Sequence, residues 1–339
     1  MNFLHLVLSL CMLIIPSANP TGQPTIAHSD TINSEVVATN MVLLSKDGGQ
    51  TWQDISYGLP VDEQLVDFFA TESAIYLSSL NDFYRRENNR KTPLWEKVND
   101  RDQKTDCSAL FRSRTILYNF GGRLYQSTST PGSWLTAFAT GQCQAPIRTI
   151  FETSGGTLFG ANNNGLYRSV DGGQSWSQVR DEGDMEMAES DGILIGTSRL
   201  GIVRSTDDGQ HWECVIREGG VGIAVEPIAG GFAAISYSTK TESRRIHVSF
   251  DGGQTWKAID KGLPPSPLIS SIKQVGGILI CGHPDGIFRS TDLGKTWNIV
   301  HLEAASRSIS IGRDSNPKKV FKIFVSDDVL YAVARNGGC

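Results

Sequence analysis

The stretch SKDGGQTW at residues 45–52 returns almost unchanged as SFDGGQTW at residues 249–256. Both fit the pattern S-x-D-x-G-x-[S/T]-W, which recurs along the chain with His211 as one departure at the hydroxyl position. The further copies are SVDGGQSW at 169–176, STDDGQHW at 205–212 and STDLGKTW at 290–297, with a worn copy, STSTPGSW, at 127–134. A motif repeated in this way indicates a repeated structural unit rather than one active site.

Tryptophan gives the period of the repeat, because every tryptophan of the chain ends an octet or a degenerate copy, at intervals of 36 to 44 residues. These residues are Trp52, Trp95, Trp134, Trp176, Trp212, Trp256 and Trp297. The stretches DGILIGTSRLGIVRS at 191–205 and GGILICGHPDGIFRS at 276–290 each read as a turn, an apolar strand, a short loop and an alternating strand. Four short strands in about 40 residues are typical of one β-propeller blade.

The seven tryptophans predict seven blades, of which six are complete in chain order. Residues 40–56 hold only two outer strands, on either side of the first octet. Residues 319–334 align with the two inner strands of the other repeats. We therefore predict an all-β, seven-bladed β-propeller over residues 40–339 with Asp-box turns, closed by a split blade that combines strands from both ends. Such closure removes sheet edges that invite aggregation.

The octet itself reads as the hairpin turn between the third and fourth strands of a blade. An aspartate accepts hydrogen bonds from backbone N–H groups of a turn, glycine adopts positive φ at little cost, and tryptophan fills the gap between blades. We predict these structural roles for Asp47, Gly49, Trp52, Asp171, Gly173, Trp176, Asp207, Gly209, Trp212, Asp251, Gly253, Trp256, Asp292, Gly294 and Trp297. One carboxylate per octet is too few ligands for calcium.

In these residues the octet resembles the Asp-box of the BNR-repeat β-propellers. That broad group includes sialidases, sortilin-type receptors, xyloglucanases and the photosystem II assembly factor. The resemblance covers residues 40–339 and implies a propeller whose Asp-boxes lie at the periphery, away from ligands. It specifies the fold and leaves the function open.

The resemblance to the enzymes of this group does not extend to their catalytic residues. Sialidases hold the substrate carboxylate with three arginines, the first in an Arg-Ile-Pro motif that this sequence lacks. Arg168, Arg204 and Arg289 each precede the serine of an octet, and equivalent positions of successive blades cannot converge on one ligand. We predict that these arginines are rungs on a strand surface. Xyloglucanases use two propellers, whereas one fits here, and we predict no catalytic residue.

The N-terminus predicts export. Residues 3–15 are almost all apolar and small residues follow, which indicates a signal peptide over 1–18 and a linker over 19–39. The expected location is secreted or periplasmic, and the large residue before Cys11 disfavours a lipoprotein. No other apolar run is long enough to span a membrane. The net charge of −5 and the lack of a basic run argue against nucleic-acid binding.

Cysteine and histidine give no metal or redox motif. Five cysteines remain after the predicted cleavage and none shows C-x-x-C spacing, and the histidines are not spaced as metal ligands. We therefore predict no metal and no cofactor. Cys107 and Cys143 fall near the starts of neighbouring inner strands, so a disulfide between them is a candidate.

The remaining candidate site is the funnel at the centre of the ring, lined by the inner strands. Its candidate lining residues are Asp67, Arg112, Arg148, Glu186 and Glu226. We predict an exported, non-catalytic and monomeric binding or assembly scaffold whose funnel takes a protein or glycan ligand. The alternative is a secreted glycoside hydrolase of sialidase-like or xyloglucanase-like type, which paired carboxylates about 5–10 Å apart in the funnel would favour.

Overall fold

The regular structure of the protein consists of β-strands. The computed structural model describes residues 41–336 apart from 62, 71–73, 80–81, 99–104, 111–115, 121–122, 128–133, 139–148, 184 and 303–318. Over these residues every sheet is antiparallel and four-stranded, which confirms the predicted all-β class. The same residues include no helix with the length and apolar character needed to cross a membrane.

Seven sheets occur in the described part of the chain, and we number them in chain order. The first, called the terminal sheet, has the order β2 (Gln53–Asp54), β1 (Val42–Ser45), β28 (Val329–Asn336), β27 (Lys319–Ser326). The second contains β3 (Leu65–Ala70), β4 (Ala74–Ser79), β5 (Phe83–Glu87) and β6 (Glu96–Lys97), and the third contains β7 (Thr105–Leu110), β8 (Ile116–Phe120), β9 (Arg123–Ser127) and β10 (Trp134–Phe138).

The other four sheets also consist of strands that follow one another in the chain. The fourth contains β11 (Thr149–Glu152), β12 (Leu158–Asn162), β13 (Gly165–Ser169) and β14 (Ser177–Arg180), and the fifth contains β15 (Met187–Ser190), β16 (Ile193–Ser198), β17 (Gly201–Ser205) and β18 (Glu213–Ile216). The sixth contains β19 (Gly219–Ile228), β20 (Gly231–Ser238), β21 (Ser243–Ser249) and β22 (Lys257–Ala258), and the seventh contains β23 (Ser271–Val275), β24 (Ile278–His283), β25 (Gly286–Ser290) and β26 (Asn298–Leu302).

Tight turns between the first two strands of a sheet set the register. Asp191 and Gly192 join β15 to β16 with φ of 51° and 74°, so Ser190 faces Ile193 across the hairpin. Positive φ at both central positions matches the right-handed twist of the flanking strands. Aspartate and glycine are the residues that tolerate this conformation, which explains why the sequence repeats such pairs between apolar strands.

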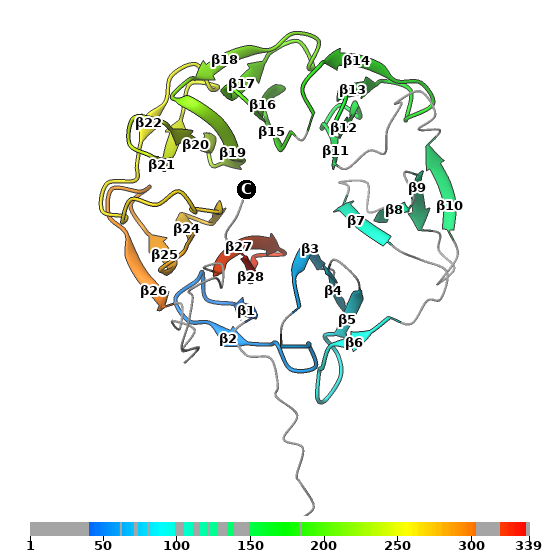
Figure 1. The fold of residues 1–339 in the computed structure, drawn as a ribbon, viewed down its shortest axis with the longest axis vertical. Helices are drawn as coiled ribbons and strands as arrows, with labels where there is room; N and C mark the ends of the chain where they lie inside the picture. The colour runs from blue at the N-terminus through cyan, green and yellow to red at the C-terminus, as the bar shows by residue number, and fades with distance from the viewer. Residues whose placement is uncertain are drawn as a thin grey trace, which may run out of the picture. The chain divides into compact units, whose positions relative to one another are not determined.

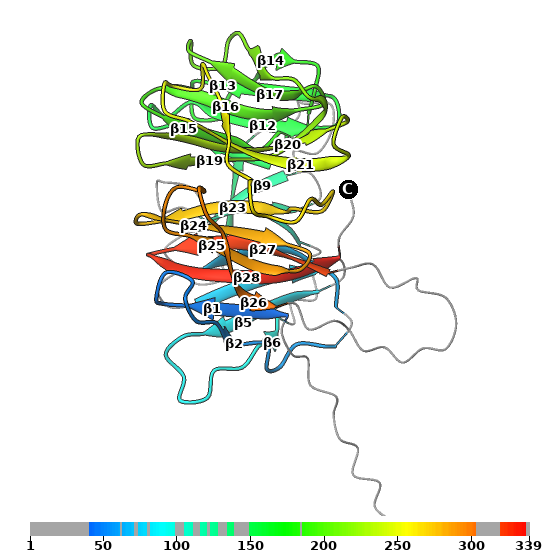
Figure 2. The same ribbon diagram turned by 90° about the vertical axis from the view of Figure 1, so that its left-hand side faces the viewer.

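The terminal sheet joins strands from opposite ends of the described chain. β1 pairs antiparallel with β28, so Val42 faces Val333 and Leu43 faces Ala332. The N–H of Ala334 donates to the carbonyl of Met41 at 2.8 Å and extends the ladder by one residue. β1 therefore lies beside β28 in both views (Figures 1 and 2).

The sheets surround a central space within the compact unit that covers residues 37–339. β3, β7, β11, β15, β19 and β27, each the first or innermost strand of its sheet, lie nearest to that space (Figure 1). Neighbouring inner strands contact one another, as β15 with β19, β19 with β23 and β23 with β27. Four-stranded sheets placed in this way are consistent with a β-propeller.

The hydrophobic core lies between neighbouring sheets. Trp95, which follows the second sheet's β5, is 2% exposed and its Nε1–H donates to the carbonyl of Ile55 in the loop after β2, at 2.7 Å. Trp297 makes the same kind of contact from the seventh sheet to Ile259, after β22 of the sixth, at 2.8 Å. A buried indole N–H needs an acceptor, so each tryptophan both fills and orients its interface.

Three arginines add a polar contact between sheets. Each lies one residue before an octet's serine and donates its Nε–H to a backbone carbonyl in the octet turn of the next sheet. The contacts are Arg168 to Asp208 at 2.7 Å, Arg204 to Gly252 at 2.6 Å and Arg289 to Gly48 at 2.9 Å. From the sequence we expected these arginines to lie on the surface of single strands. In the structure each guanidinium instead connects two neighbouring sheets. The Arg289 contact links the seventh sheet to the terminal sheet.

Candidate functional site

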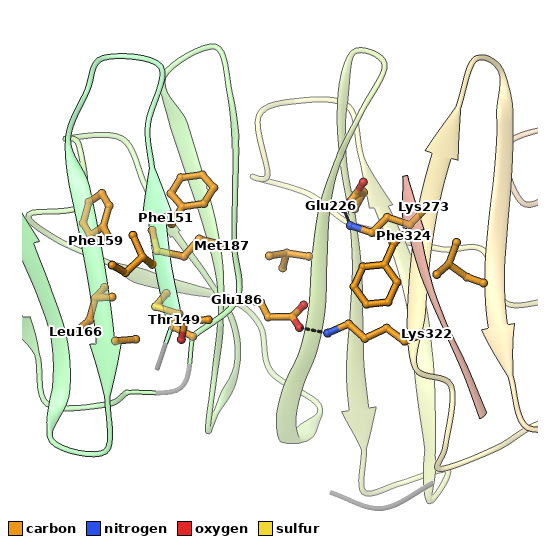
Figure 3. A pocket seen from close by; sticks show the side chains of 15 residues that line it. Thr149, Phe151, Phe159, Leu166, Glu186, Met187, Glu226, Lys273, Lys322 and Phe324 are labelled. Carbon is orange, nitrogen blue, oxygen red and sulfur yellow. Dashed lines mark hydrogen bonds and ion pairs between the residues drawn. The ribbon is translucent and has the colours of Figure 1, made fainter. Parts of the chain in front are cut away.

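A cavity of about 380 Å³ lies among the inner strands of the fourth, fifth, sixth, seventh and terminal sheets (Figure 3). It is lined by Thr149, Ile150, Phe151, Phe159, Ala161, Leu166, Met185, Glu186, Met187, Val225, Glu226, Lys273, Lys322, Ile323 and Phe324. Its size is within the range of sites that bind small molecules or short peptide segments. Apolar side chains form one wall, and the other carries Glu226, Lys273 and Lys322 together with the ring of Phe324 (Figure 3).

The charged wall contains an ion pair between neighbouring sheets. Lys273 on β23 donates to the carboxylate of Glu226 on β19. Burial raises the pKa of Glu226, the ammonium of Lys273 opposes that rise, and the nearby charge of Glu186 adds to it. The two glutamates therefore lie close enough in the cavity to influence each other electrostatically.

A second ion pair crosses the cavity. Lys322 on β27 of the terminal sheet donates to Glu186 at 2.9 Å, and Glu186 belongs to the segment that leads into β15 of the fifth sheet. Two bonds to Thr197 hold the Glu186 backbone, since Glu186 N–H donates to the Thr197 hydroxyl and Thr197 N–H donates to the Glu186 carbonyl, each at 2.9 Å. The carboxylate thus extends from a fixed backbone toward the opposite wall (Figure 3).

The apolar wall comes from the fourth and fifth sheets. Phe159 and Leu166 are each 1% exposed and pack in one cluster with Met185, while Phe151 and Met187 are half-buried against it. Gly196 on β16 provides the room for Met185, because a Cβ at this glycine would overlap the methionine side chain. A larger residue at position 196 would push Met185 into the cavity.

The structure places two of the five candidate funnel residues, Glu186 and Glu226, in the cavity lining. Asp67 is on β3, facing Ser78 in the ladder, but its side chain lies outside the described residues. Arg112 and Arg148 lie outside them altogether.

The candidate disulfide is likewise untested. Cys107 belongs to β7, of which only the backbone is described, and Cys143 lies outside the described residues. Cys214 and Cys281 are free thiols, the first exposed and the second buried. No group of three or more histidine, cysteine or acidic side chains in the described ranges is arranged to hold a metal ion.

Sequence reasoning missed Lys273 and Lys322. A signal for Lys322 was present, because the alignment of FKIFVSDD at 321–328 with MEMAESDG at 185–192 puts Lys322 at the strand position of Glu186. Opposite charges at equivalent positions of two inner strands indicate a pair across the centre. The same signal was present for Lys273, because it stands two residues before the end of β23, as Glu226 does on the neighbouring inner strand β19.

The octet aspartates lie in turns and do not line this cavity. Asp47 shows the pattern: one carboxylate oxygen accepts from the Ser45 hydroxyl at 2.8 Å and from the N–H groups of Gln50 and Thr51 at 3.0 Å, and the other accepts from the Thr51 hydroxyl at 2.5 Å. Such bonds favour the charged carboxylate.

The same bonding lowers the pKa of three octet aspartates to about 2. The first cause in each case is the hydrogen bond from the hydroxyl four residues later, Ser175, Thr255 or Thr296. The aspartates concerned are Asp171, Asp251 and Asp292. One octet nevertheless borders a smaller cavity of about 250 Å³, which Asp251 and the exposed Phe250 line together with Asp191.

Comparison with known proteins identifies the repeat. Residues 247–258 match the BNR/Asp-box repeat. The chain carries a BNR/Asp-box repeat. Comparison with curated protein sequences gives no match.

Solved structures match the fold. YCF48 bound to D1 peptide is 15% identical, with 88% of this chain and 99% of that chain covered and a TM-score of 0.57. An ancestral GH74 enzyme is 14% identical over 84% of this chain and only 45% of its own, with a TM-score of 0.57. Virginiamycin B lyase from Staphylococcus aureus is 13% identical over 80% and 95%, with a TM-score of 0.54. Identities at this level show a β-propeller-like fold alone.

Proposed function

We propose that this protein is an exported, non-catalytic scaffold that binds a segment of another protein in the cavity on its inner strands. The seven sheets serve as the blades of a closed propeller in this proposal, and the terminal sheet is the split blade that closes it. A closed ring holds the inner strands in fixed positions, so the cavity is formed before the ligand arrives. Pre-formed sites avoid the free energy of ordering the protein during binding.

The observation that carries the proposal is the pairing of both cavity carboxylates with lysines. Glu226 is held by Lys273 and Glu186 by Lys322, so the cavity presents two neutralised pairs beside an apolar wall. This mixture suits a peptide, which brings apolar side chains, charges and backbone hydrogen-bonding groups together. The similarity to a structure of YCF48 bound to a peptide supports the same class of ligand.

A glycoside hydrolase is the second candidate, because two carboxylates share the cavity and burial, with a smaller contribution from the charge of Glu186, raises the pKa of Glu226. A glycosidase needs one protonated carboxyl group as acid and a second carboxylate free to act as nucleophile or base. Here each carboxylate already binds an ammonium group within the described cavity. The geometry therefore favours binding over hydrolysis.

Selection from a random linear peptide library on the full chain tests the proposal. Selected peptides carrying a benzophenone should cross-link to the segments around Met187, Val225 or Phe324, as read by mass spectrometry of the digest. Leu200→Glu, in the exposed turn between β16 and β17, is a control that should bind the same peptides equally.

The opposite outcome is also defined. Turnover of a sialoside or a xyloglucan oligosaccharide that disappears in Glu226→Gln would replace the scaffold with the hydrolase. Binding of such a sugar without turnover would replace the peptide with a glycan ligand, and cross-links that avoid the cavity would contradict the site.

A further inference from the structure

The apolar wall of the cavity has the character of a side-chain pocket. Phe159, Leu166 and Met185 are buried, and Phe151 and Met187 are half-buried on the side that faces the charged wall (Figure 3). These five residues, which we call the anchor pocket, come from two neighbouring sheets and also belong to one packed cluster. The cavity therefore reaches into the interface between the fourth and fifth sheets.

The cavity that the anchor pocket helps to line has room for a large apolar side chain. A cavity of about 150 Å³ lined by apolar residues accepts benzene, and the whole cavity measures about 380 Å³. Two of the five lining residues are methionines, whose unbranched thioether side chains adapt to differently shaped partners. Leucine, methionine and phenylalanine side chains all match this space, whereas a polar side chain would lose its hydration without a matching partner on the apolar wall.

A carboxylate stands beside the anchor pocket. Glu186 lies between Met185 and Met187 in the sequence, and its carboxylate lines the same cavity as both methionines. Its present partner, Lys322, comes from the opposite wall. The side chain of Glu186 is 42% exposed and that of Lys322 is 27% exposed. An ion pair so accessible to water contributes little stability, so a ligand cation can replace the lysine.

We propose that the cavity binds a peptide in which a leucine, methionine or phenylalanine fills the anchor pocket and an adjacent lysine or arginine takes the place of Lys322 at Glu186. The inference rests on the proposed function and specifies its ligand. A basic neighbour fits better than an acidic one, because a ligand carboxylate beside the anchor pocket would be repelled by the carboxylate of Glu186.

Methionine methyl NMR provides a direct test, because the chain has only five methionines and three of them lie beyond the predicted signal peptide. The probe is the acetylated and amidated hexapeptide Gly-Gly-Leu-Lys-Gly-Gly, added to the full chain labelled with 13C at the methionine methyl groups. Its binding should shift the signals of Met185 and Met187. Met41, 2% exposed in another core cluster and not part of the cavity lining, is the internal control and should not shift.

Two altered probes separate the parts of the proposal. Serine in place of leucine should weaken binding by about tenfold or more, because the apolar burial is lost. Glutamate in place of lysine should also weaken it, through repulsion by Glu186. Equal shifts with leucine and serine, or with lysine and glutamate, overturn the proposal, as does the absence of any shift at about 10 mM of the first probe, ten times a Kd of 1 mM.

Variants test the exchange of Lys322. Lys322→Gln removes the competing ammonium and should tighten binding of the Leu-Lys probe, while Glu186→Gln should abolish the preference for lysine over glutamate and keep the preference for leucine over serine. Leu200→Glu, in the exposed turn between β16 and β17 and outside the cavity lining, is the control and should retain both preferences. Weaker binding of the Leu-Lys probe to Lys322→Gln, in a variant with an unchanged unfolding midpoint, would contradict the exchange.

The failure of this inference is distinguishable from the failure of the proposed function. Library peptides that cross-link to the cavity but lack an apolar residue beside a basic one would agree with the proposed scaffold function and refute the proposed anchor residue. A library that gives no cavity ligand refutes both.

Discussion

A covalent link between β1 and β28 would measure how much the terminal sheet contributes to stability. Val42 and Val333 are partners in the ladder, 0% and 1% exposed, and both belong to the same core cluster. Facing residues of antiparallel strands have Cβ atoms about 4.5–5.5 Å apart, close to what a disulfide requires. The double substitution Val42→Cys with Val333→Cys therefore places two thiols where they can oxidise with small backbone adjustment.

The expected magnitude follows from the loop that the link closes, which spans about 290 residues. Chain entropy alone gives about 6 kcal/mol for a loop of this length, and observed disulfides typically contribute about 2–4 kcal/mol. Each valine-to-cysteine change removes buried methyl volume and costs about 1 kcal/mol. Comparison of the oxidised with the reduced form of the same variant cancels that cost, so we expect a gain of about 2–4 kcal/mol on oxidation.

Guanidinium unfolding, followed by tryptophan fluorescence with and without reductant, measures the gain as a shift of the midpoint. The single variant Val42→Cys is the control and should have one midpoint under both conditions. Peptide mapping identifies the cross-linked pair against the native cysteines. Thiols that fail to join in the folded protein, or equal midpoints for the oxidised and reduced forms, would refute the idea that β1 and β28 close the structure.

Two further predictions concern the octet turns. Gly209→Ala should destabilise the protein more than Gly172→Ala, by about 1–3 kcal/mol in chemical unfolding. Both glycines have φ near 70°, but only at Gly209 would the new Cβ overlap Phe159 of the preceding sheet. Equal losses of stability in the two variants would argue against this packing. The lowered pKa values of Asp171, Asp251 and Asp292 predict stability that is complete above their ordinary value of 3.8 and is lost as the pH falls toward about 2. The triple Asp→Asn variant should show a shallower loss over this window, and an unchanged slope would exclude these turns as its source.

The regular parts of the fold were predictable because they depend on local chemistry. An octet such as residues 45–52 needs an aspartate, glycines and a tryptophan at set positions whatever surrounds it, so its copies can be recognised in the sequence. The alignment also predicted that residues 319–334 form inner strands, and in the structure β28 of this segment pairs with β1, so that Val333 faces Val42. Local pattern and strand order carried this information without knowledge of the packing.

The contacts between sheets were not predictable in the same way. Arg289 looks like any alternating strand residue, and its acceptor, the carbonyl of Gly48, lies at the far end of the chain. The anchor pocket depends on how Met185 fits against Gly196 and on the spacing of two sheets, which no single repeat encodes. Both glutamates of the cavity were among the candidate funnel residues. Their partners Lys273 and Lys322 were missed, although each lysine stands at the strand position of its glutamate.

The pairing of β1 with β28 has a consequence for synthesis on the ribosome. About 290 residues separate these strands, and at ~5–20 residues per second the first waits for some 15–60 s before its partner is made. During that time the edge of β1 offers unpaired N–H and C=O groups to any other nascent chain. The edge of β1 is thus protected only once β28 has been made. A chaperone that shields residues 41–56 would act on the nascent chain before that point, when it is most exposed to misassembly.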